Sequence, residues 1–181
     1  MLKPLPDTPP RFHGARAFND AKERFSFWVA TNWQQLELDD QREGALFVPD
    51  PEDLDTHLSV WVSGLAHPIQ AQDLPDLRRG LEQGLAQLPD CEVESRSDDT
   101  YDNLIKFERV ITYGAASDPA LRCKRKSWYL YVDTWSIVLA WQGSTVERYE
   151  YWLPMGNYAF GTFNVAEWLW FATDRELGPR L

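Results

Sequence analysis

Two groups of carboxylates are the first residues whose types and spacing could do chemistry. They lie in the stretches PDPEDLD and SDDTYDN, and their members are Asp50, Glu52, Asp53, Asp55, Asp98, Asp99 and Asp102. Clustered carboxylates can bind a hard cation through oxygen ligands, but neither spacing matches a calcium loop, which also needs a glycine at its sharp turn. Solvated acidic turns are the simpler interpretation, so we expect no bound metal.

The histidines and cysteines form no catalytic or zinc-binding pattern. His13, His57 and His67 are far apart and lack the HExxH spacing. Cys91 and Cys123 have no CxxC arrangement and are expected to be buried thiols rather than a disulfide. No glycine-rich loop precedes a helix in a βαβ context, and no serine or threonine has the context of a nucleophile elbow. We therefore expect no cofactor, no catalytic residue and no enzymatic activity.

One cationic run interrupts an acidic chain. The 181 residues hold 18 Lys and Arg against 28 Asp and Glu, a net charge of −10, which argues against a nucleic-acid partner because phosphates would be repelled. The run comprises Arg122, Lys124, Arg125 and Lys126. By strand alternation Lys124 and Lys126 share a face with Trp128, and this patch either meets an anionic partner or is a strand end in solvent.

Four aromatic residues are our preferred candidates for a binding surface. Trp28, Trp61, Tyr129 and Tyr131 are out of phase with the apolar sets of their own strands, so they belong to the other sheet face. Either a second helix layer covers them, or they form a homodimer face or a peptide groove. The aromatic content of 14% suits a large core and also an interface.

The elements that position these residues are mostly strands. Alternation of side-chain character predicts strands near 25–30, 45–48, 58–63, 91–97, 105–113, 128–132 and 135–141. Leucines at three- and four-residue steps predict a helix from Asp73 to Leu88, with Pro89 as a stop signal. Residues 1–14 hold four prolines and are expected to be extended, and residues 15–24 to form a short helical turn.

The stretch 127–163 defines the fold class best. One core face is predicted for its two strands, from Trp128, Leu130, Val132, Trp135, Ile137, Leu139 and Trp141. Further apolar residues on the opposite face imply a sheet that is covered on both sides. After Gly143 a long helix is predicted, with Ser144 and Glu147 at the spacing of a capping box and a kink at Pro154.

This order of elements resembles the PsbP and Mog1-like superfamily. The likeness covers roughly residues 25–165 and is carried by the strand FSF with its trailing Trp33, the helix DLPDLRRGLEQGLAQL after LSVWVSG, and the ending SIVLAWQGSTVERYEYWLPMGNYAFGTF. That ending is similar to the superfamily's strand followed by a Tyr-x-x-Tyr/Trp-Leu-Pro helix and Ser/Thr-Phe. The resemblance implies an α+β fold, a single-domain α/β/α sandwich with a mainly antiparallel sheet of about six or seven strands and helices on both faces.

The resemblance also implies a function. Members of the superfamily act as binding or adaptor proteins: one type binds a small GTPase, another supports photosystem assembly, and bacterial ones are chaperones for secreted effectors, often as homodimers. We therefore expect a non-catalytic protein-binding or chaperone-like adaptor that uses an aromatic sheet face or groove, with another protein or a second copy as partner. Two alternatives stay open: a small-ligand-binding protein, and an immunity-type protein that masks a basic partner through the carboxylates of residues 50–55.

The chain length is within the range of one domain. We expect an extended N-terminal arm at residues 1–22 and one domain at 23–181, with a short C-terminal extension from about 165. The start MLKPLPDTPPRFHG has no apolar stretch of the length that an export signal needs, and no run of about 18 apolar residues occurs. We therefore expect a cytoplasmic protein without membrane insertion.

Overall fold

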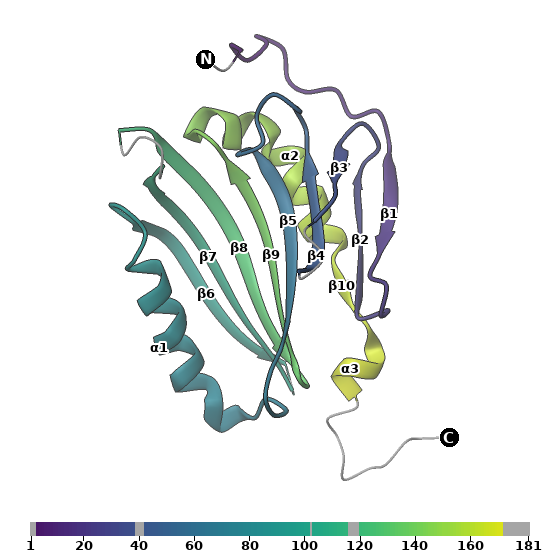
Figure 1. Cartoon of the computed structure of the whole chain (residues 1–181), viewed down its shortest axis with the longest axis vertical. Helices are drawn as coiled ribbons and strands as arrows, with labels where there is room; N and C mark the ends of the chain where they lie inside the picture. The colour runs from purple at the N-terminus through teal and green to yellow at the C-terminus, as the bar shows by residue number, and fades with distance from the viewer. Residues whose placement is uncertain (1–2, 39–41, 102, 116–119, 172–181) are drawn as a thin grey trace.

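The computed structural model describes residues 3–38, 42–101, 103–115 and 120–171, which form two antiparallel sheets and a few helices (Figure 1). The large sheet has the order β3-β4-β5-β9-β8-β7-β6. Its strands are β3 (Gln34–Leu36), β4 (Glu43–Val48), β5 (His57–Gly64), β6 (Glu92–Tyr101), β7 (Leu104–Gly114), β8 (Arg122–Val132) and β9 (Trp135–Gly143). The α+β class and the predicted number of strands in the main sheet are confirmed.

A small sheet and the helices complete the described fold. The small sheet has the order β1-β2-β10, formed by β1 (Ala15–Asn19), β2 (Phe25–Ala30) and β10 (Asn164–Val165). The helices are α1 (Leu74–Leu85), which follows a 3₁₀ turn at Ala71–Asp73, then α2 (Val146–Thr162) and the short α3 (Glu167–Phe171). In Figure 1 the large sheet is curved, α1 is seen beside β6 at the lower left, and the small sheet lies beyond β4.

Two sequence-based predictions about the N-terminal region are wrong. Residues 15–24 do not form a helical turn, because Ala15–Asn19 pair with β2 as the strand β1. The physical reason is Phe18, whose ring lies 5.2 Å from that of Phe27 and 5.6 Å from that of Phe47, so that pairing buries an aromatic side chain. The strand from Phe25 also lies outside the main sheet, since β2 pairs only with β1 and β10 among the described strands.

One face of the large sheet, which we call the α2 face, packs against α2 and the small sheet. Its core contains the predicted row of alternating residues on β8 and β9, together with Phe25, Phe27 and Val29 of β2. Trp141 is fully buried there, 5.2 Å from the ring of Trp33. The strand faces predicted for the stretch 127–163 are therefore confirmed.

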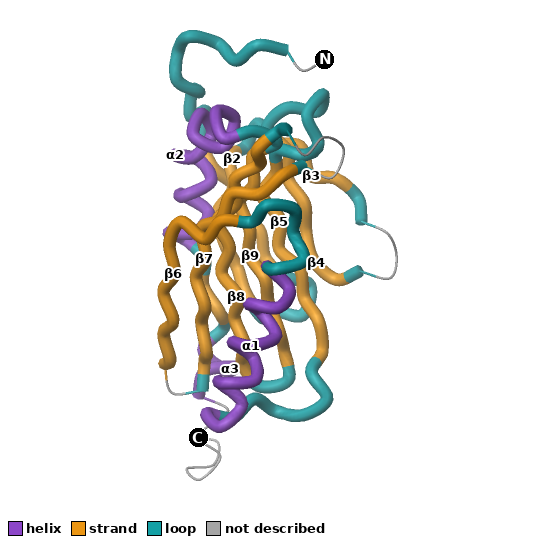
Figure 2. Tube along the Cα trace, turned by 90° about the vertical axis from the view of Figure 1, so that its left-hand side faces the viewer, coloured by secondary structure: helices purple, strands orange, loops and turns teal. Residues whose placement is uncertain are grey.

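The opposite face, which we call the α1 face, carries a second core beneath α1. Leu81 and Leu85 are the buried residues of α1, and they belong to one cluster with Ile105, Phe107, Ile111, Tyr113 and Cys123. These partners lie on β7 and β8, and in Figure 2 α1 crosses in front of the sheet on this side. Leucine periodicity predicted the helix correctly, although its regular part ends at Leu85.

The start of α2 differs from the predicted capping box. Thr145, not Ser144, is the N-cap residue, and its side chain accepts a hydrogen bond from the backbone N–H of Arg148. Ser144 instead donates its hydroxyl to Asp53. Gly143 is required just before this start, because a Cβ there would lie 2.3 Å from the backbone N of Tyr149.

Close approach of α2 to β9 depends on Gly156. A Cβ at this position would lie 2.7 Å from Cγ of Trp141, whose Nε1 donates to the carbonyl oxygen of Tyr149 at 3.3 Å. Real Cβ atoms do not approach this closely, and Trp141 is fully enclosed, so the ring has no free space to move into. The glycine therefore sets the distance between helix and sheet.

An ion-pair cluster joins the β1–β2 turn to β4. The guanidinium of Arg24, which is 2% exposed, lies 2.7 Å from Asp20 Oδ2 and 2.7 Å from Glu43 Oε2. It also lies over the ring of Trp135, 4.5 Å from the centroid. This cluster connects the small sheet to the large one through charge-assisted hydrogen bonds.

We expect Gly156→Ala to lower the free energy of unfolding by about 1–3 kcal/mol, as overpacking of a full core does. Gly161, later in the same helix, is the matched control, because a Cβ there meets nothing within 4 Å. Gly161→Ala should raise stability by about 0.5–1 kcal/mol through the helix propensity of alanine. Urea denaturation followed by tryptophan fluorescence measures both changes, and equal effects of the two variants would contradict the close contact.

Asp20 should make the free energy of unfolding depend on pH in the acidic range. Burial alone would raise the pKa of Asp20, but hydrogen bonds from Arg24 outweigh it and the pKa lies below the ordinary value of 3.8. A carboxyl with a lowered folded-state pKa contributes stability that is present above the unfolded pKa of about 3.9 and is lost as pH falls through the folded pKa. We expect denaturation curves taken below about pH 4 to show a smaller loss for Asp20→Asn than for the wild type. Parallel losses in both proteins would contradict this.

Candidate functional site

Three of the four candidate aromatics lie on the α1 face of the large sheet. The strand register places Trp61 of β5 opposite Val138 of β9, Val138 opposite Tyr129 of β8, and Tyr129 opposite Phe107 of β7. Tyr131 stands on the same face two residues further along β8. The register therefore lines up residues from four strands in one cross-strand row.

Helix α1 covers only part of this row. Phe107 is fully buried beneath it, while Tyr129 and Tyr131 are partly buried and pack against the same cluster. Burial raises the pKa of the Tyr131 hydroxyl. Of the two alternatives for these tyrosines, cover by a helix is therefore realised in part, because α1 shields one portion of each side chain.

The remaining members of the row lie beyond the helix. Trp61 and Val138 are partly exposed, and among the described residues neither belongs to a core cluster. The guanidinium of Arg42 lies over the indole of Trp61, 5.4 Å from the ring centroid. We call Trp61, Val138 and the adjoining edge of Tyr129 the Trp61 strip, because they form an aromatic and apolar surface that α1 leaves open.

Trp28 lies elsewhere. It belongs to the small sheet, its side chain is 47% exposed, and its backbone N–H donates to Thr162 Oγ1 at the end of α2. Strand alternation predicts only that Trp28 points away from Phe27. Because β2 belongs to the small sheet, Trp28 does not lie beside the other three aromatic residues.

Lys124 and Lys126 lie on the α2 face with Trp128, as predicted, but both interact with acidic or polar residues. Lys124 Nζ lies 2.9 Å from Glu94 and 2.8 Å from Glu150. Lys126 Nζ contacts Asn157 of α2 at 3.4 Å and lies 4.9 Å from the ring centroid of Phe160. These contacts hold α2 against β8 and leave the two lysines little capacity for an anionic partner.

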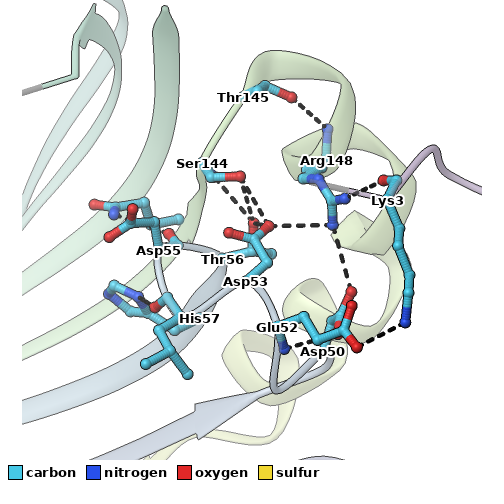
Figure 3. A network of polar contacts seen from close by, with 12 residues as sticks. Lys3, Asp50, Glu52, Asp53, Asp55, Thr56, His57, Ser144, Thr145 and Arg148 are labelled. Carbon is cyan, nitrogen blue, oxygen red and sulfur yellow. Dashed lines mark hydrogen bonds and ion pairs between the residues drawn. The ribbon is translucent and has the colours of Figure 1, made fainter. Parts of the chain in front are cut away.

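A buried polar network connects the β4–β5 loop to the start of α2 (Figure 3). The carboxylate of Asp53, which is 3% exposed, accepts from Thr56 Oγ1 at 2.6 Å and from Ser144 Oγ at 2.8 Å. It also lies 3.2 Å from Arg148 Nη1, and Arg148 donates through Nη2 to the carbonyl oxygen of Lys3. Asp53 therefore anchors the acidic loop to α2, while Glu52 and Asp55 stay exposed to solvent as expected.

This network lacks the geometry of a nucleophile and base. His57 Nδ1 lies 2.9 Å from the carbonyl oxygen of Leu54, so this nitrogen carries the proton and does not contact Ser144. Burial lowers the pKa of His57 and raises the pKa of the Cys91 and Cys123 thiols. Thiols with raised pKa values are protonated at neutral pH and are poor nucleophiles.

Residues that would hold a metal do not gather in the described part of the chain, where no three His, Cys, Asp or Glu side chains form such a group. An open hollow of about 560 Å³ at the β3–β4 edge is lined by Gln35, Leu36, Glu37, Leu38, Arg42 and Gly44. Small-ligand sites are mostly apolar, so these walls do not favour the small-ligand alternative.

None of the helices in the described ranges is both long enough and apolar enough to cross a membrane.

Arg125 is a site residue that sequence reasoning did not single out. It alternates with Lys124 and Lys126, so the same rule that places them on the α2 face places Arg125 on the α1 face. Its guanidinium lies 5.1 Å from the ring centroid of Tyr113, whose hydroxyl donates to Gln142 Oε1 at 2.6 Å. Burial raises the pKa of Tyr113 to about 12, so the phenol remains a neutral donor.

Comparisons with known proteins show the fold. Neither a protein-family model nor a curated protein matches the sequence. Among solved structures the chain is similar to the cyanobacterial PsbP (CyanoP) of Synechocystis sp. PCC 6803, with 12% identity, a TM-score of 0.57, and coverage of 84% of this chain and 92% of that one. It is similar to LpqN, involved in cell envelope biogenesis of Mycobacterium tuberculosis, with 12% identity, a TM-score of 0.58, and coverage of 88% and 90%.

A third similar structure is the Ran-binding protein Mog1p of Saccharomyces cerevisiae, with 12% identity, a TM-score of 0.52, and coverage of 84% of this chain and 95% of that one. The chain therefore has the PsbP/Mog1-like fold, as the sequence resemblance indicated. At this identity the likeness establishes the architecture and carries no residue-level role.

The polar network generates a stability prediction. Arg148→Met removes the cation beside buried Asp53 and should lower the free energy of unfolding by about 3 kcal/mol, because a buried carboxylate is left without its counter-ion. Lys3→Met is the matched control, since the Lys3–Glu52 pair is 70% and 59% exposed and the backbone carbonyl of Lys3 remains. Thermal and urea unfolding should show a loss for the first variant only. A fully stable Arg148→Met protein would show that the network does not anchor the loop.

Proposed function

We propose that this chain is a non-catalytic protein-binding adaptor whose partner docks on the Trp61 strip. One observation carries the proposal: α1 packs over β7 and β8, whereas Trp61 and Val138 on β5 and β9 stay partly exposed in register with Tyr129. Partly exposed aromatic residues on a rigid surface are typical of interface hot spots.

The strip is held rigidly from below. Trp61 and Val138 stand on the inner strands β5 and β9, whose opposite faces carry the fully buried Val60, Leu139 and Ile137. Tyr129 is fixed at the margin by the second core. A surface of this kind loses little conformational entropy on binding, which favours affinity.

The fold supports a binding role. Mog1p is a Ran-binding protein, so this architecture presents a protein-binding surface in at least one similar structure. The protonated thiols and the histidine that faces a carbonyl oxygen give no support to an enzymatic alternative.

The acidic loop does not favour an immunity-type function. Asp53 and Asp50 lie 3.2 Å and 3.7 Å from Arg148, and Glu52 lies 2.7 Å from Lys3. Asp53 and Asp50 are therefore less available to a basic partner than solvated carboxylates, and Glu52 is the exposed member of the three. Whether the partner is a different protein or a second copy is decided by the crosslinking experiment that follows.

We expect a photo-crosslinking amino acid at position 61 to capture the partner in the native host, and the same group at the exposed position 28 not to capture it. The mass of the product distinguishes a second copy from another protein. With the purified partner, Trp61→Ala should weaken binding by about 30-fold, the effect of a hot-spot residue, and Trp28→Ala should leave it within about two-fold.

Thermal melts provide the control for this experiment. Trp61→Ala should retain most of the wild-type stability, because Trp61 is outside both clusters of buried residues that the structure describes. If Trp61→Ala unfolds readily while a folded fraction binds normally, Trp61 is a core residue and the proposal is wrong.

A further inference from the structure

Among the described residues the partly buried Arg16 and Arg125 lie over the rings of Phe47 and Tyr113, and of these two only Arg125 has a shielded Nε without an acceptor. The buried arginines each have carboxylate partners: Arg24 pairs with Asp20 and Glu43, Arg109 with Glu82 and Asp98, and Arg148 with Asp50 and Asp53. Arg125 is partly buried, and within the described residues it forms no ion pair or hydrogen bond. Its Nε is shielded from solvent without an acceptor.

A shielded guanidinium nitrogen without a hydrogen-bond acceptor is unusual. Arginine carries five N–H donors in a planar fork that matches a carboxylate, and a shielded donor without a partner is unfavourable. The chain carries ten more acidic than basic residues, so carboxylates are abundant, yet none of those described reaches Arg125 within ion-pair distance. The site is therefore complementary to a carboxylate from outside the chain.

The guanidinium is also held in place. It lies over the ring of Tyr113, and the Tyr113 hydroxyl is fixed by Gln142, the residue opposite Arg125 on β9. Gln142 in turn donates to the carbonyl oxygen of Asp55. A cation stacked on a fixed aromatic ring is oriented before a ligand arrives, which lowers the entropy lost on binding.

Arg125 lies on the same face as the Trp61 strip and close to it. Tyr129 and Arg125 are four residues apart on β8, or about 13 Å at about 3.3 Å per residue. Between them on β5, β9 and β8 lie the small, buried residues Ser59, Ala140 and Ser127 in mutual register. The same row continues on β7 with Arg109, which is paired with Glu82 and Asp98. An extended segment of about four residues would span the distance from an apolar side chain on the strip to a carboxylate at Arg125.

We propose that Arg125 binds a carboxylate of the partner segment, about four residues from an apolar side chain that contacts the Trp61 strip. This rests on the proposed function, because the strip supplies the second contact. The ligand is a single carboxylate of a protein rather than a polyphosphate, since the one guanidinium of Arg125 in a chain of net charge −10 does not offset the repulsion of many phosphates.

Selection from a displayed library of random peptides of about twelve residues tests this without requiring that the partner be identified. The purified wild-type protein, Trp61→Ala and Arg125→Gln serve as parallel targets, with Arg96→Gln as the control for loss of an exposed arginine. We expect wild type and Arg96→Gln to enrich peptides with Asp or Glu about four positions from a large apolar residue. Libraries with a free and with a blocked C-terminus distinguish a terminal carboxylate from a side chain.

Each outcome decides between the two proposals. If enriched peptides depend on Trp61 but bind Arg125→Gln equally well, the carboxylate site is wrong and the proposed function stands. If wild type enriches nothing beyond Trp61→Ala, the proposed function fails. Calorimetry with the best peptide should show roughly 10-fold weaker binding after Arg125→Gln, the same loss after Glu→Gln in the peptide, and no further loss when both changes are combined.

Discussion

The contact between Gly156 and Trp141 sets the spacing on which the rest of the structure depends. Trp141 fills the space between β9, α2 and Trp33, and the missing side chain at position 156 lets the helix settle onto the indole. Because α2 lies this close to the sheet, its first turn reaches the β4–β5 loop, where Ser144 and Arg148 bind Asp53. The N-terminal segment is attached to the same helix, because Arg148 and Tyr151 donate hydrogen bonds to the carbonyl oxygens of Lys3 and Thr8. One helix–sheet distance thus organises segments from both halves of the chain.

The two faces of the large sheet are used differently. The α2 face is closed by a long helix and a second sheet, and its row of Leu58, Val60, Leu139 and Trp141 is fully buried. The α1 face has one shorter helix, which covers β7 and β8 and leaves β5 and β9 with Trp61 and Val138 partly exposed. A sheet of seven strands is wider than one helix can cover, so part of this face remains available for binding.

Within the net charge of −10, several carboxylates are paired with buried arginines. Many carboxylates are not at the surface as isolated charges but bind buried arginines, as Asp20, Asp98 and Asp53 do. For Asp98, burial alone would raise the pKa, but hydrogen bonds and the charge of Arg109 outweigh it and lower the pKa. The unpaired Arg125 is informative for this reason, because the same chain supplies partners for its other buried arginines.

The sequence by itself determined the elements whose signal is local. The buried side of β7, β8 and β9 is predicted by alternation, and that of α1 by its leucine spacing. The order of these elements indicates the fold. Only the tertiary structure decided what depends on distant partners: that residues 15–19 form a strand, that Trp28 and Trp61 lie in different sheets, and that α1 stops short of β5 and β9. Asp53 and Ser144 are 91 residues apart in sequence, and no local pattern encodes their contact. Periodicity gives the face of a strand, but which part of that face stays uncovered follows from where other elements pack.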